Sequence, residues 1–120
     1  MSHIAKIKTQ MKDPAMLEKA CQLMKASYTA VGSAQIYSVH RSGQVINLPG
    51  WRFPIVVDPK TGELHYDNYG GSWGSMEQID RLTQNYAKLT AMATLRKAGH
   101  RVIEQSLPDG SVRLIAEVEA

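Results

Sequence analysis

Aromatic side chains concentrate in one stretch of the 120-residue sequence. Five of the eight aromatic residues fall between positions 51 and 73, namely Trp51, Phe53, Tyr66, Tyr69 and Trp73. Polar side chains lie among them, and loops that combine aromatic and polar side chains make good binding surfaces. The candidate binding residues are therefore Trp51, Arg52, Tyr66, Asp67, Tyr69 and Trp73. The simpler interpretation is that Trp73 and Tyr66 only close one end of the core.

The same stretch is rich in glycine and leads into a helix. Glycines at positions 70, 71 and 74 would let the backbone approach a partner closely or let the loop move. Free backbone donors at the start of the helix, over residues 75–78, form a possible anion site. The stretch lacks both the dinucleotide-binding glycine spacing and the Gly-Lys-Ser/Thr of a phosphate-binding loop.

No group of residues has the spacing of a catalytic or metal site. The four histidines are scattered, although His65 and Asp67 would share one face of a strand and could hydrogen bond. The single cysteine, Cys21, lies on an apolar stripe and is expected in the core. No serine has the setting of a nucleophile elbow. We expect a protein that is not an enzyme and needs neither a metal nor another cofactor.

The charge balance is mildly basic, with 14 Lys and Arg against 11 Asp and Glu, a net charge of +3. Five basic residues near the start and after the long helix could form one nucleic-acid-binding surface: Lys6, Lys8, Arg96, Lys97 and Arg101. A solvated face of mixed charge is the default interpretation. The single cysteine fits a reducing compartment, and no apolar stretch reaches the roughly 18 residues of a membrane span. We expect a cytoplasmic protein without a signal peptide.

Apolar periodicity and turn residues predict the elements of the first half. A strand is expected over His3–Thr9, and Asp13-Pro14 should begin a helix whose apolar stripe is Leu17, Ala20, Cys21, Met24 and Tyr28. Gly32-Ser33 should end that helix. A strand over Ala34–His40 should turn at Ser42-Gly43 into a short strand over Gln44–Leu48.

The second half has clearer signals. Two hairpins are expected, over residues 54–67 with a turn at Pro59–Gly62 and over residues 100–118 with a turn at Pro108–Gly110. Between them a helix should run from Ser75 to Ala98, with Ser75 and Gln78 as a capping box and Gly99 as the terminal cap. In the last strand Ile115 is an exception, because it is apolar on the polar face.

These elements predict a single α+β domain over residues 1–120. The order β-α-β-β-β-β-α-β-β indicates a two-layer sandwich, with an antiparallel sheet of six or seven short strands and two helices on one face.

Both ends of the sequence resemble a known family. The opening MSHIAKIKTQ, the closing run RLTQNYAKLTAMATLRKAGHRVIEQSLPDGSVRLIAEVEA and Trp73-Gly74 are similar to domain-of-unknown-function family 1257, the family of the hypothetical plastid protein called open reading frame 35. Residues 30–54 do not follow the resemblance. Members occur in cyanobacteria, plastids and phage-like genomes, sometimes beside a gene for an AAA-type ATPase. The resemblance implies an accessory protein and assigns no catalytic residue.

The function expected from the sequence is that of a small interaction protein. It would self-associate and bind an unidentified protein partner, such as an AAA-type ATPase or another large complex. Two alternatives remain, a nucleic-acid-binding protein that uses the five basic residues and a small-molecule binder at the aromatic stretch between Trp51 and Trp73.

Overall fold

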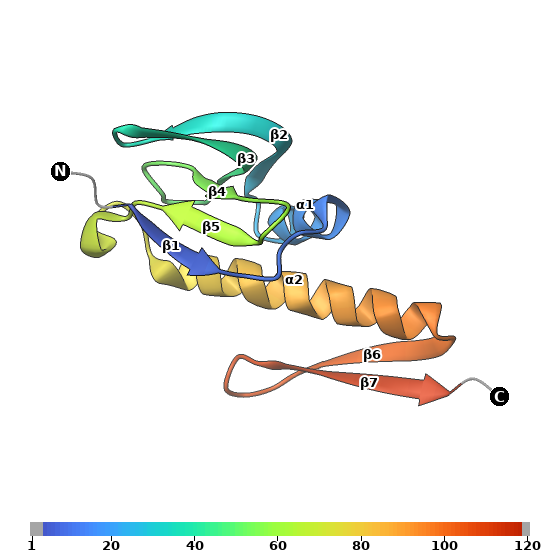
Figure 1. Ribbon diagram of the computed structural model, residues 1–120. Coiled ribbons are helices and arrows are strands. Elements are labelled where there is room, and N and C mark those ends of the chain that lie inside the picture. The colour runs from blue at the N-terminus through green and yellow to red at the C-terminus, as the bar shows by residue number, and fades with distance from the viewer. Residues whose placement is uncertain (1–3, 119–120) are drawn as a thin grey trace. The chain divides into compact units, whose positions relative to one another are not determined.

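The computed structural model describes residues 4–118, so His3 of the expected first strand lies outside the described residues. The elements follow the expected order, which confirms the α+β class (Figure 1). They are β1 (Ala5–Lys8), α1 (Pro14–Leu23), β2 (Ser27–Ile36), β3 (Val39–Asn47), β4 (Ile55–Val57), β5 (Glu63–Tyr66), the 3₁₀ turn η1 (Tyr69–Gly71), α2 (Met76–Lys97), β6 (His100–Ser106) and β7 (Val112–Val118).

The strands divide into two antiparallel sheets where one was expected. A five-stranded sheet has the order β1-β5-β4-β3-β2, and β6 pairs only with β7 within residues 4–118. The chain correspondingly forms two compact units, one up to Tyr86 and one from Ala87 onward, and α2 runs through both. We call them the first and the second unit.

The first helix is shorter than expected. Asp13 caps it through Oδ1, which accepts from the amide of Ala15 at 3.0 Å, and Pro14 follows as predicted. The helix ends at Leu23 because Lys25 adopts a left-handed backbone, with φ of 59°. Tyr28, expected on the helical stripe, is instead the second residue of β2.

The predicted turn at Ser42-Gly43 is wrong. Gly43 lies inside β3 opposite Gly32, and β2 reverses into β3 through the two residues Tyr37 and Ser38. Glycine serves a different purpose at position 43, since a Cβ there would lie 2.9 Å from the carbonyl oxygen of Val57. Gly43 therefore allows β4 to pack closely against β3.

Apolar side chains from the five-stranded sheet, α1 and the start of α2 form the core of the first unit. Those with at most 3% exposure include Leu17, Cys21, Ile46, Ile55, Leu64, Ile79 and Leu82. The core also contains Gln44, whose amide donates to the Met11 carbonyl at 3.2 Å while its oxygen accepts from the Tyr28 hydroxyl at 2.7 Å. The Tyr86 hydroxyl accepts from the amide of Asp13 at 3.1 Å, which ties α2 to the start of α1.

The predicted hairpins and the long helix are confirmed. Asp58 Oδ1 accepts from the amide of Lys60 at 2.8 Å in the β4–β5 turn, and Gly62 supplies its left-handed residue. α2 ends before Gly99, which has φ of 88°, and Gly110 has φ of 87° in the β6–β7 turn. Among the described residues, neither helix is long and apolar enough to cross a membrane.

Candidate functional site

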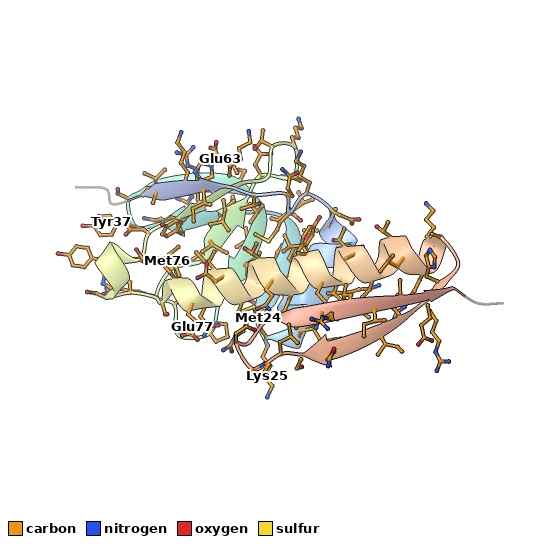
Figure 2. All side chains as sticks on the ribbon, turned by 90° about the horizontal axis from the view of Figure 1, so that it is seen from below. Met24, Lys25, Tyr37, Glu63, Met76 and Glu77 are labelled. Carbon is orange, nitrogen blue, oxygen red and sulfur yellow. The ribbon has the colours of Figure 1, made fainter. Side chains whose placement is uncertain are left out.

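Three aromatic rings of the first unit meet around the ring of Trp73. The Tyr69 ring stacks on the Trp73 ring with centroids 4.7 Å apart, and the rings of Phe53 and Tyr37 lie 5.2 Å and 5.5 Å from it. They come from the β2–β3 turn, the β3–β4 loop and the segment before α2. We call Tyr37, Phe53, Tyr69 and Trp73 the aromatic cluster. In Figure 2, Tyr37 lies beside the η1 turn, away from the body of the first unit.

The two tyrosines of the cluster are exposed and held in an unusual backbone conformation. Tyr37 and Tyr69 are 40% and 48% exposed, and their φ angles are 54° and 47°. A bulky residue in the left-handed region is uncommon, because its Cβ crowds the backbone at a cost of about 1–2 kcal/mol. Local hydrogen bonds hold the Tyr69 turn, since Asp67 Oδ1 accepts from the Tyr69 amide at 3.0 Å and Ser72 donates to the Tyr69 carbonyl at 3.1 Å.

Arg52 adds a positive charge to the cluster. Its amide donates to the Trp73 carbonyl at 2.8 Å, which joins the β3–β4 loop to the segment before α2. Its guanidinium lies 5.1 Å from the centre of the Trp73 ring and 5.6 Å from that of Phe53. These distances are typical of cation–π contacts. The rings of Phe53 and Trp73 thus position the guanidinium group, although Arg52 stays exposed.

Trp51 and Tyr66 form a separate pair. Their rings meet edge to face at 5.9 Å, and the Trp51 indole donates to the Ser75 carbonyl at 3.1 Å. Gly74 packs so tightly against the Trp51 ring that a Cβ at position 74 would overlap it. Trp51 therefore anchors the start of α2. The simpler interpretation had assigned the closing of the core to Trp73 and Tyr66, and of these two Tyr66 packs against Trp51.

Asp67 is part of the interior of the loop, since it is 1% exposed. Its Oδ2 and the Nδ1 of His65 are buried without hydrogen-bond partners among the described residues. The His65–Asp67 pair considered from the sequence does not form, because His65 Nε2 lies 3.0 Å from Glu63 Oε1. Burial lowers the pKa of His65 and nearby Arg41 lowers it further, while Glu63 raises it. The net direction is downward, so the contact with Glu63 does not outweigh the burial.

Ser75 caps the start of α2 as predicted, but its hydroxyl bonds to the amide of Glu77 and not to that of Gln78. Ser75 Oγ accepts from the amide of Glu77 at 3.2 Å, and the Gln78 amide donates to the Ser75 carbonyl at 3.1 Å. The hydroxyl thus satisfies one of the backbone donors that were considered as an anion site.

The five candidate basic residues belong to different units. Lys6 and Lys8 are exposed on β1 of the first unit. The others are exposed in the second unit, where Arg101 lies opposite Glu117 in the β6–β7 ladder. Each unit thus carries its own basic residues, and in the second unit Arg101 has an acidic neighbour.

Cys21 is a core residue, as predicted. It is fully buried, and burial is the main cause that raises the pKa of its thiol to about 12. A thiol with this pKa is unreactive at neutral pH. No three His, Cys, Asp or Glu side chains gather into a possible metal site within residues 4–118.

Sequence reasoning missed Tyr37 because the residue lies well before the aromatic stretch. The available signal was the apolar pair Ile36 and Val39, which flanks two residues and is the pattern of a tight hairpin. No protein-family model, curated protein or solved structure matches the chain. Comparison with known proteins therefore adds no further residues to the site.

Proposed function

We propose that this chain is a small non-enzymatic interaction protein that binds a protein partner through the aromatic cluster and Arg52, and that it also self-associates. The supporting observation is that Tyr37 and Tyr69 are both exposed, both left-handed and both in contact with Trp73. Strained residues of this kind persist where the surrounding structure fixes them, and they concentrate at functional sites.

The chemistry of the cluster fits protein recognition. Trp, Tyr and Arg are the residues most enriched among those that dominate binding energy at interfaces. The rings also restrain one another before a partner arrives, so binding would freeze little additional side-chain motion. A partner with an apolar side chain flanked by an acidic group would complement two tyrosines beside Arg52.

The resemblance to family 1257 supports a partner within a larger machine, of which an AAA-type ATPase is one example. The buried free thiol of Cys21 supports action in the reducing environment of the cytoplasm.

Photo-crosslinking tests the partner surface. Benzoylphenylalanine in place of Tyr37 or of Tyr69 should link the protein to the same discrete partner in an extract of the source cells. Val31, apolar and 90% exposed in the same unit, is the matched control position and should give no such product. The purified partner should then bind the wild-type protein at least about tenfold more tightly than the Tyr37→Ser/Tyr69→Ser variant. Equal labelling from position 31, or equal affinity of the variant, would contradict the proposal.

Nucleic-acid binding is the second candidate, favoured by the Arg52 guanidinium over the Trp73 ring. Exposed aromatic rings beside a cation stack on single-stranded bases. Fluorescence anisotropy with labelled single-stranded oligonucleotides should then show affinity that falls as salt rises and that is lost in the Tyr37→Ser/Tyr69→Ser variant. The absence of binding at low salt with micromolar protein would eliminate this candidate.

A further inference from the structure

We propose that the face of the β6–β7 hairpin that carries Ile103 and Ile115 is the surface on which a second copy of the chain docks. The inference rests on the proposed self-association and names its site. Ile103 and Ile115 are directly opposite each other in the ladder, and each is 39% exposed. An exposed apolar pair on one face of a two-stranded sheet favours a covering partner.

The other face of the hairpin contacts α2 within the second unit. Glu104 Oε1 lies 3.1 Å from Lys88 Nζ of α2, and Val102 and Leu114 on the same face as Glu104 are half-buried. Because successive residues of a strand point to opposite faces, Ile103 and Ile115 lie on the side away from this ion pair. The hairpin turns back from the end of α2 (Figure 1).

Charged side chains flank the isoleucine pair in a pattern that complements itself. On one side Arg101 is opposite Glu117, and on the other Gln105 is opposite Arg113. All four share the face of the isoleucines by strand alternation, and all four are exposed. The face therefore has an apolar middle row between two polar rows, one of which carries both an acidic and a basic residue.

A twofold axis brings these rows together in one of two ways. If each β6 lies over the β6 of the second copy, Glu117 faces Arg113 of the second copy. If each β6 instead lies over the β7 of the second copy, Glu117 faces Arg101. Isoleucine meets isoleucine in both arrangements, as an isologous interface requires. Both arrangements also place two identical ion pairs at the rim, so the face is complementary to its own copy in charge and in apolarity.

The size of the face predicts a weak dimer. A strand of seven residues is about 24 Å long, and two paired strands are about 10 Å wide, so the contact is smaller than the ~800 Å² per partner of a standard stable interface. We expect dissociation constants of about 10–100 µM, which sedimentation velocity across that concentration range can measure.

Charge reversal in separate chains tests the surface. Glu117→Arg should weaken the dimer by at least about tenfold in either arrangement, since it turns two symmetric ion pairs into two repulsions. Arg113→Glu should have the same effect only where β6 lies over β6, and Arg101→Glu only where β6 lies over β7. An equimolar mixture of Glu117→Arg and Arg113→Glu should dimerise again if β6 lies over β6, because every pair is then complementary between unlike chains. If β6 lies over β7, the mixture of Glu117→Arg with Arg101→Glu should dimerise instead. Lys19→Glu, at an exposed position of α1, is the control. It changes the net charge as much as Arg113→Glu and should leave the dimer unaffected.

Rescue by mixing cannot arise from refolding of one hairpin, because each chain keeps its own substitution in the mixture. Restored association in one of the two mixtures supports the proposal. A wild-type protein that dimerises while Glu117→Arg dimerises equally well would overturn this surface and leave self-association standing. A wild-type monomer at all concentrations would overturn both, and the photo-crosslinking result would still decide the partner surface independently.

Discussion

Replacing Gly74 by alanine would place a methyl group inside the space of the Trp51 indole. The nearest atoms to the added Cβ belong to the fused ring of Trp51, which is rigid and cannot swing away as a flexible chain end could. The indole is also fixed by its hydrogen bond to Ser75 and its contact with Tyr66. The ring or the start of α2 must therefore move.

The cost follows from the contacts that such a movement disturbs. Overpacking costs about 1–3 kcal/mol in a tightly packed site. The hydrogen bond from Trp51 to Ser75 contributes about 1 kcal/mol, and the edge-to-face contact with Tyr66 contributes about 0.5–1.5 kcal/mol. Since only part of each is lost on relaxation, we expect Gly74→Ala to lower the free energy of unfolding by about 2–4 kcal/mol. With a urea slope of about 2 kcal/mol/M, the midpoint should fall by about 1–2 M.

Urea unfolding followed by circular dichroism measures this effect, and two further variants isolate its cause. Gly70→Ala is the matched control, because position 70 is left-handed with φ of 62° but has no atom within 4 Å of the added Cβ. It should cost only about 1 kcal/mol from backbone strain. In a Trp51→Leu background, Gly74→Ala should cost less than about 1 kcal/mol, since the smaller side chain leaves room for the methyl group.

Two results would refute this reasoning. One is a Gly74→Ala protein as stable as the wild type, which would mean that the indole yields without loss. The other is a cost that stays the same in the Trp51→Leu background, which would place the damage in the backbone at position 74 and not in the ring.

Three further predictions concern single residues of the first unit. Lys25→Gly should stabilise the protein by about 0.5–1 kcal/mol in urea unfolding, because glycine adopts the left-handed backbone at position 25 without strain; an unchanged midpoint would contradict this. Cys21 should resist a thiol reagent at pH 8 in the folded protein and react at once in urea, since burial raises its pKa to about 12; rapid labelling without urea would show that the site opens. Burial is also the main cause that raises the pKa of Tyr28 from 10.0 to about 12, so its contribution to stability is complete below pH 10 and is lost as pH rises toward 12. Tyr28→Phe should flatten stability against pH in that range, and an identical pH dependence in the variant would exclude Tyr28 as the cause.

Where turns and caps have their own chemical signals, the sequence was sufficient to predict the structure. The Asp58 and Asp109 turns, the Ser75 cap and the Gly99 terminus all use residues whose side chain or flexibility specifies the local backbone. The first three turns of α2 bury Ile79, Leu82 and Tyr86.

The segment from Tyr28 to Gly43 was predicted incorrectly, because tertiary contacts help to set its backbone conformation. Met24 and Tyr28 are spaced as on a helix, but the left-handed Lys25 between them ends the helix without a glycine. Tyr37 then occupies a turn position that favours glycine, while the glycine at 43 is needed for contact with β4. The close contact of Gly43 with β4 cannot be inferred from local sequence, whereas the Tyr37 turn had a local signal only in the apolar residues that flank it.

The aromatic stretch was correctly found as one group in the sequence, but the fold separates it by function. Trp51 and Tyr66 are fixed from several sides by Gly74 and Ser75, so they account for the order of the loop and for the start of α2. Trp73 instead collects exposed rings, including Tyr37 from outside the stretch. Packing at the end of the core accounts for the positions of Trp51 and Tyr66. It does not explain why two strained tyrosines surround Trp73 at the surface, and this difference is the reason to look for a partner there.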